Sequence, residues 1–226
     1  METIEPHVTV TGDEFHHSIR VVRARAGEEV ELFDRAGNAA RGVVESIDRD
    51  SAVIAAKEPL PSRESPLALH LAMAVIQLEK FELVLQKGTE LGVKTFIPLI
   101  TERVELRPER YANKTDRWNK IVFEAVKQCG RAVVPKIEPP TTFEDAIARP
   151  GPKLLFDADA APPTANRQQP TDLTLLIGPE GGWSEEELRH ARDRGVAFER
   201  LGPRRLRAET AAIAAVSVIA SRFGDL

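Results

Sequence analysis

Apolar and polar positions alternate differently in the two parts of this chain, and the change comes near residue 66. Short runs rich in Val, Ile and Phe cover residues 28–33, 39–47 and 51–58. Turn residues such as Gly37-Asn38 separate these runs, as between neighbouring strands of a sheet. The pattern predicts a small β-barrel or meander. The proline-containing segment 60–66 predicts a linker.

From residue 67 onward, strand patterns and helix patterns alternate. Apolar runs predict strands over residues 67–76, 93–100, 153–159, 173–178 and 196–202. Helical spacing and capping residues predict helices over residues 78–92, 117–130, 184–195 and 207–223. Two of the strand runs are almost continuously apolar, as in parallel strands that helices cover on both faces. We therefore expect an α/β domain with a mostly parallel sheet over residues 67–226, after a β-rich domain over residues 1–66.

The composition is that of a folded protein, with 226 residues, 42% of them hydrophobic and 29% charged. No apolar run approaches the length of a membrane span, and the first residues lack the layout of a signal peptide. The single cysteine, Cys129, excludes an internal disulfide and a cysteine-based metal cluster, and its spacing predicts a place on the apolar face of a helix. We therefore expect a cytoplasmic protein that uses neither a membrane nor a metal.

Charge is unevenly distributed along the chain. The net charge of −4 argues against a uniformly basic surface for nucleic acid. Residues 1–66 alone hold 8 Lys and Arg against 13 Asp and Glu, which gives them a net charge of −5. Local basic clusters nevertheless occur at Arg20, Arg23 and Arg25, at Lys127, Arg131 and Lys136, and at Arg200, Arg204, Arg205 and Arg207. Each cluster is either a set of phosphate contacts or an ordinary solvated surface.

Two strands of the second region end in similar Gly-Pro turns that carry polar groups. The strand over 173–178 leads into the sequence IGPEGGWS, and the strand over 196–202 leads into LGPRRLRAET. Ligands of open α/β sheets bind beyond the carboxyl ends of strands. The first turn has no lysine for a phosphate, and Glu180 would repel an anion. A nucleoside without phosphates fits better, and S-adenosylmethionine is such a ligand. Alternatively, Glu180 binds backbone amides or a neighbouring arginine.

Several segments together resemble one family. They are EFHHSIRVVRARAGEEVELFD (14–34), FELVLQKGTELGV (81–93), RWNKIVFEAVKQCGRAVVPKI (117–137), IGPEGGWSEEEL (177–188) and LGPRRLRAETA (201–211). They resemble the bacterial RsmE proteins, methyltransferases of the SPOUT class that use S-adenosylmethionine to methylate N3 of a uridine in small-subunit ribosomal RNA. The resemblance implies a PUA-like β-barrel for RNA recognition and a trefoil-knotted catalytic domain that forms a homodimer. The chain departs from the family in lacking an arginine-rich start and in carrying Ala208 where a threonine is usual.

The resemblance also implies roles for residues of the two turns. The expected cofactor-binding residues are Leu176, Ile177, Gly178, Pro179, Glu180, Gly181, Leu201, Gly202 and Leu206. Arg207 is expected to contact the uracil oxygens, since a guanidinium is a permanently charged array of donors. Glu209 is either the general base or a helix-capping residue. The expected RNA-binding residues are Arg20, Arg23, Arg131, Arg204 and Arg205, of which Arg131 alternatively contacts the partner subunit.

Small residues of the last helix, from Ala208 to Ser221, permit close packing across a dimer interface or inside one subunit. Two alternatives to ribosomal RNA methylation stay open on the sequence alone. One is methylation of another RNA, such as transfer RNA, and the other is RNA binding without catalysis.

Overall fold

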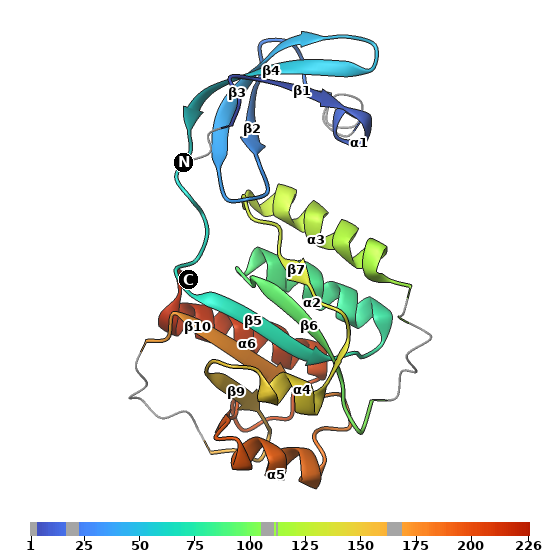
Figure 1. Cartoon of the computed structure of the whole chain (residues 1–226), viewed down its shortest axis with the longest axis vertical. Helices are drawn as coiled ribbons and strands as arrows, with labels where there is room; N and C mark the ends of the chain where they lie inside the picture. Colours follow the sequence, from blue (N-terminus) through green and yellow to red (C-terminus); the bar gives the residue numbers. More distant parts are fainter. Residues whose placement is uncertain (1–3, 17–22, 105–110, 112, 162–168) are drawn as a thin grey trace. The chain divides into compact units, whose positions relative to one another are not determined.

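The computed structural model describes residues 4–16, 23–104, 111, 113–161 and 169–226, which form two compact units (Figure 1). The first unit comprises Met1–Glu64 together with Gly130–Val134, and the second comprises Ser65–Cys129 and Pro135–Leu226. The main division lies two residues before the boundary expected from the sequence. The sequence pattern did not indicate that the loop 130–134 packs with the first unit.

The first unit is built on an antiparallel sheet with the strand order β1-β4-β3-β2. Its elements are β1 (His7–Thr11), α1 (Gly12–Phe15), β2 (Glu29–Phe33), β3 (Ala39–Ile47) and β4 (Ser51–Pro59). The predicted turn between β2 and β3 is closed by Asp34, whose carboxylate accepts the backbone N–H groups of Ala36, Gly37 and Asn38 at 2.8–3.0 Å. The three predicted strands are confirmed, and β1 and α1 are additional.

The second unit contains a sheet of parallel strands with the order β11-β9-β10-β5-β6-β7, and β8 pairs with β6. The strands are β5 (Ala68–Ala74), β6 (Thr95–Ile100), β7 (Lys136–Ile137), β8 (Thr141–Thr142), β9 (Lys153–Phe156), β10 (Asp172–Ile177) and β11 (Ala197–Glu199). Every pairing within this sheet is parallel. The expected fold class is therefore confirmed. Because all strands run the same way, their carboxyl ends share one edge, where ligands of such sheets bind.

Helices cover both faces of the parallel sheet. They are α2 (Leu78–Glu90), α3 (Thr115–Cys129), α4 (Phe143–Ala148), α5 (Glu185–Asp193) and α6 (Ala208–Phe223). On one face, α4 and α5 pack onto a buried cluster that includes Ala72, Leu155 and Leu176. On the other, α6 packs against β5 and β10, and α2 packs against α6 and α3 (Figure 1).

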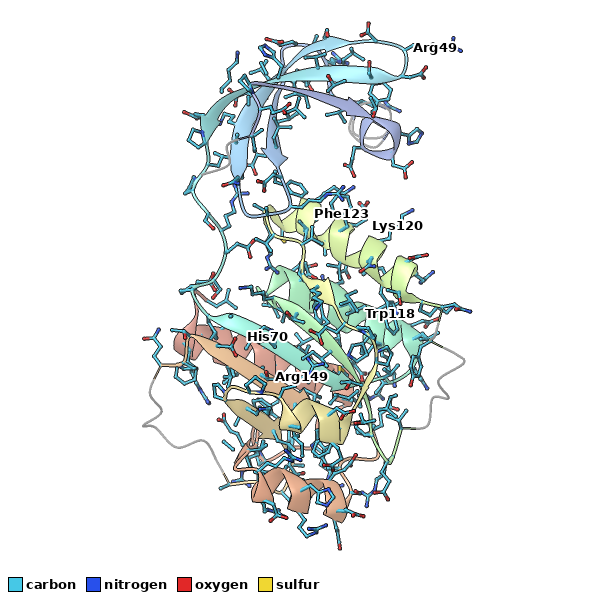
Figure 2. All side chains as sticks on the ribbon, in the orientation of Figure 1. Arg49, His70, Trp118, Lys120, Phe123 and Arg149 are labelled. Carbon is cyan, nitrogen blue, oxygen red and sulfur yellow. The ribbon has the colours of Figure 1, made fainter. Side chains whose placement is uncertain are left out.

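Aromatic packing joins α2 to α3. The rings of Phe81 on α2 and Trp118 on α3 lie 4.9 Å apart between centroids, and Trp118 is labelled in Figure 2. Trp118 is 1% exposed, which confirms the apolar face predicted for this helix. Cys129, at the end of the same face, is only partly buried, and its thiol donates to the carbonyl of Val126. None of the helices in the described part of the chain is long and apolar enough to span a bilayer.

Candidate active site

A cavity of about 510 Å³ lies where β9, β10 and β11 end. It is lined by Arg103, Phe156, Asp157, Ala158, Asp159, Ile177, Gly178, Pro179, Glu180, Gly181, Gly182, Trp183, Leu188, Leu201, Gly202, Arg204, Arg205, Leu206, Arg207, Ala208 and Ala211. Its size is within the range of roughly 300–1,000 Å³ that is usual for small-molecule sites. The two Gly-Pro turns singled out in the sequence therefore line the same cavity.

The turn after β10 is shaped by Trp183. The indole N–H of Trp183 donates to the carbonyl of Phe156 at 3.0 Å, which ties the turn to the end of β9. A Cβ on Gly178 would lie 3.0 Å from the Trp183 ring and would push the buried ring by a few tenths of an ångström, so this close approach favours glycine. Gly182 has φ +70°, a conformation that L side chains rarely adopt. The glycines thus allow the backbone of this turn to pass close to the buried indole ring.

Glu180 is paired with a lysine from another element. The ammonium of Lys80, in the first turn of α2, donates to the Glu180 carboxylate. Both side chains are partly exposed, so the pair fixes the loop at a modest gain in stability. This contact supports a role for Glu180 in holding the loop in shape. Its partner is a lysine, and not the arginine or the backbone amides that were the alternatives on the sequence.

Glu187 connects the start of α5 to the loop after β6. It completes the predicted capping box with Ser184, whose N–H donates to the Glu187 carboxylate at 2.8 Å. The other carboxylate oxygen of Glu187 accepts the N–H of Glu102 at 3.0 Å. The next residue, Arg103, donates from its guanidinium to the carbonyl of Gly181 at 3.1 Å. Buried Glu187 therefore helps to place Arg103 at the wall of the cavity.

Three further polar residues of the cavity follow β6 and β9 and were not predicted from the sequence. Asp157 and Asp159 line the cavity directly after β9, which ends at Phe156. The strand predicted over 153–159 was too long and included both carboxylates. Arg103 likewise follows β6 by three residues. The available signal for all three is their place beyond the carboxyl ends of parallel strands, where ligands bind.

The predicted cofactor-binding residues line the cavity with one exception. Leu176 is 0% exposed and belongs to the core cluster beneath α4 and α5, so its side chain is not available to a ligand. The side chains of successive strand residues point to opposite faces of a sheet. The neighbouring Ile177 is the last residue of β10, and it does line the cavity.

The two predicted catalytic residues are placed differently. Arg207 lines the cavity at the N-terminus of α6. Glu209 does not line it, although Ala208 and Ala211 on the same helix do. One oxygen of the Glu209 carboxylate is buried and has no hydrogen-bond partner among the described residues. This position does not support Glu209 as the general base.

Among the predicted RNA-binding residues, Arg204 and Arg205 line the cavity mouth and are exposed. Arg205 approaches Asp159 at 3.7 Å, but both side chains are more than 80% exposed, so this ion pair is weak. Arg23 is exposed in the first unit. Arg20 lies outside the described residues.

Arg131 is buried, contrary to the expectation of an RNA contact. Its side chain is 5% exposed, and its guanidinium donates to the Glu64 carboxylate at 2.6 Å within the first unit. The same carboxylate accepts the N–H groups of Ala132 and Val133. Burial alone would raise the pKa of Glu64, but the hydrogen bond and charge of Arg131, with the two backbone donors, lower it below its ordinary value. Arg131 therefore anchors the loop 130–134 and is not available to RNA.

A second, smaller cavity of about 180 Å³ adjoins the first. It shares Arg103 and the segment Pro179–Gly181 with the larger cavity, and its other wall is formed by Val75, Ile76 and Gln77. These three residues connect β5 to α2, so this cavity also lies at the carboxyl edge of the parallel sheet. In the part of the chain that the structure describes, no three His, Cys, Asp or Glu side chains are grouped so as to hold a metal ion.

Comparison with known proteins gives consistent matches. A family model described as an RNA methyltransferase domain matches residues 63–220, and an RNA methyltransferase PUA domain model matches residues 10–56. Proteins named ribosomal RNA small subunit methyltransferase E are similar to the chain. The protein of Synechocystis sp. is 33% identical, covering 96% of this chain and 74% of its own length, and that of Bacillus subtilis is 30% identical, covering 95% and 90%.

Two solved structures are similar over the whole chain. The protein of the same name from Neisseria gonorrhoeae, bound to S-adenosylmethionine, is 30% identical with a TM-score of 0.90, covering 100% of this chain and 96% of that one. A methyltransferase from Legionella pneumophila, in complex with the same cofactor, is 35% identical with a TM-score of 0.87 and the same coverage.

Proposed function

The chain belongs to the family of ribosomal RNA small subunit methyltransferase E, and from this premise we propose that it transfers a methyl group from S-adenosylmethionine to N3 of a uridine in small-subunit ribosomal RNA. The observation that carries this proposal is the cavity of about 510 Å³, which both Gly-Pro turns line together with the carboxylates of Asp157, Asp159 and Glu180. Such a lining offers acceptors to ribose hydroxyls and to the positive charges of S-adenosylmethionine.

The residues of the cavity fit this cofactor. Ile177, Leu201 and Leu206 provide apolar surface for a flat base, and the Asp157 carboxylate is an acceptor for ribose hydroxyls or an ammonium group. Gly202 has φ +128°, which favours glycine. When bound, S-adenosylmethionine would supply the methyl group: the bond between methyl and sulfur breaks as the bond to N3 forms, the electron pair stays on sulfur, and the N3 proton passes to water.

The protein contributes orientation and charge to this transfer. Rigid turns that hold both reactants in line remove most of the entropic cost of bringing them together. Loss of the N3 proton leaves negative charge on the uracil oxygens, and Arg207 at the cavity wall stabilises that charge. Arg204 and Arg205, exposed at the same edge, are suited to phosphates of the RNA that flank the target base.

The first unit supplies RNA recognition in this proposal, and two copies of the chain form a homodimer. Apolar side chains on α6, among them Ile213 and Val218, are only partly buried within the chain, which supports packing against a second subunit. Ribosomal RNA as substrate places the enzyme in the cytoplasm.

Calorimetric titration with S-adenosylhomocysteine tests the cofactor assignment. We expect one site per chain, and we expect Gly202→Val to abolish binding because a β-branched side chain is strained at this φ. Gly195→Ala, at the end of α5 and outside the cavity, is the control for a glycine with positive φ. Absence of heat with the unaltered protein at high concentration would contradict the assignment.

A further inference from the structure

We propose that the smaller cavity beside the cofactor site binds the target uracil, with Gln77 and Arg103 as hydrogen-bond donors to the two carbonyl oxygens that flank N3. This inference rests on the proposed function and adds to it the residues that distinguish uridine from cytidine. Neither residue was expected from the sequence to have a role.

The position of the cavity is the first argument. Methyl transfer requires the acceptor atom to approach the donor directly, so the base must lie next to the cofactor and share a wall with it. The smaller cavity shares Arg103 and the segment Pro179–Gly181 with the larger one. The larger cavity has room for a whole cofactor. The smaller one is therefore left for the acceptor.

The side chain of Gln77 is the second argument. Gln77 occupies the N-cap position of α2, where its backbone carbonyl accepts the N–H groups of Lys80 and Phe81 at 3.0 Å. N-cap side chains usually bond to the helix, but the Gln77 side chain makes no such bond. It is exposed and lines the cavity. Its side-chain amide is therefore not used to cap α2.

The placement of Arg103 is the third argument. Its guanidinium is already held at one nitrogen by the carbonyl of Gly181, and Glu187 fixes the backbone of the preceding residue. A guanidinium has five N–H donors, so others remain for a base. A fixed positive charge at this point adds to that of Arg207, which lines only the larger cavity, in stabilising the negative charge that appears on O2 and O4 when N3 loses its proton.

The donor-only group of Arg103 selects uracil over cytosine. Uracil presents an acceptor oxygen at C4, whereas cytosine presents an amino group, which is itself a donor. A guanidinium at this oxygen has no acceptor and would meet that amino group without forming a bond, while Gln77 binds the other carbonyl oxygen, O2. N3 lies between these two oxygens, and Arg103, which binds one of them, also lines the cofactor cavity. The arrangement thus accounts for the choice of base and brings the side of the base that carries N3 near the cofactor.

Substitutions at Gln77 provide the test, with small ribosomal subunits from a strain that lacks the enzyme as substrate. We expect Gln77→Met to lower kcat/KM about tenfold through loss of one hydrogen bond. Gln77→Glu should lower it further, because a carboxylate repels the carbonyl oxygen. If Gln77 only supported α2, Gln77→Glu would be harmless, since a negative charge is favourable at a helix N-terminus. Glu79→Gln, exposed in the same helical turn, is the matched control.

Two further measurements separate the explanations. The affinity for S-adenosylhomocysteine should stay within about twofold in the Gln77 variants. A parallel loss of that affinity would mean that the smaller cavity holds part of the cofactor, and this would overturn the inference. Arg103→Ala should shift the rising limb of the pH–kcat profile to higher pH, because loss of the positive charge destabilises the N3 anion and raises the pKa of N3.

The outcome for the unaltered protein separates failure of this inference from failure of the proposed function. If it forms N3-methyluridine and both Gln77 variants match it, the assignment of the smaller cavity is wrong. If it binds S-adenosylhomocysteine but forms no N3-methyluridine, the proposed function itself is wrong, and this inference is wrong with it.

Discussion

At the scale of single residues, Arg207 and Glu209 lie two positions apart in the chain but in different surroundings. Arg207 lines the cofactor cavity, whereas Glu209 does not. Arg207 is the N-cap residue, with extended backbone, whereas Glu209 lies in the first turn of α6, so the two side chains leave the chain from different backbone conformations. The sequence indicated that both belong to a functional motif, but it did not indicate which of them reaches the ligand.

Substitution of these two residues should therefore have unequal effects. We expect Arg207→Ala to lower kcat about a hundredfold, because a charge that stabilises the transition state is lost. Glu209→Gln should leave the pH–rate profile unchanged and stability unchanged or higher, since a neutral amide is less costly to bury than a carboxylate. The measurement is kcat as a function of pH on small subunits. Loss of the acidic limb in Glu209→Gln would instead identify Glu209 as the general base.

The ion pair between buried Arg131 and partly buried Glu64 makes a second prediction. Arg131→Ala should lower the free energy of unfolding by about 2 kcal/mol, because it leaves the partly buried Glu64 carboxylate without its main partner. Arg41→Ala, which removes an exposed pair with Glu58 in the same unit, should change it by less than about 1 kcal/mol. Denaturant unfolding followed by circular dichroism measures both. Equal effects would contradict the structural role of Arg131.

The same pair gives the pH dependence of stability. The pKa of Glu64 is lowered in the folded protein, so its contribution is fully present above the ordinary value of 4.5 and is lost as the pH falls below it. The unaltered protein should therefore lose stability as the pH is lowered from about 5 toward 3. In Arg131→Ala this loss should be smaller, since the folded pKa of Glu64 returns toward its ordinary value. An equal loss in both proteins would exclude Glu64 as a source of the acid sensitivity.

At the scale of elements, helix α5 combines a stabilising cap with a role in the site. Ser184→Ala removes one capping bond and should cost about 1 kcal/mol without changing kcat. Glu187→Gln has only one oxygen left to accept the two N–H groups of Ser184 and Glu102. It should therefore lower kcat about tenfold as well as stability, through displacement of Arg103. Equal kcat values in the two variants would show that Glu187 is only a capping residue.

The elements also show what the sequence could and could not predict. Long helices and buried strands were predictable because hydrophobic periodicity and capping residues define them locally. Helix α4 was missed although Thr142 caps it by accepting the N–H of Asp145, since only one turn and a half of periodic pattern follows. The two-residue strands β7 and β8 exist only through pairing with β6, and such tertiary pairing leaves no local pattern.

At the scale of the whole molecule, the main feature that the sequence did not predict is that the loop 130–134 belongs to the first unit. The loop 130–134 follows a helix of the second unit but packs with the first, through Arg131 and Glu64. Arg131, a basic residue just after a helix, suggested an exposed phosphate contact. Its pairing could not be predicted, because its acidic partner Glu64 lies 67 residues away in the chain. The knot expected from the family resemblance stays a prediction, because strand order does not by itself define how the chain is threaded.

Mass spectrometry of nucleosides from small-subunit ribosomal RNA tests the central claim most directly. Small subunits from a strain that lacks the enzyme would be treated with this protein and S-adenosylmethionine, with omission of the cofactor as the control. We predict that N3-methyluridine is absent before treatment and approaches one residue per subunit after it. An unchanged N3-methyluridine content, from protein that binds S-adenosylhomocysteine, would contradict the claim.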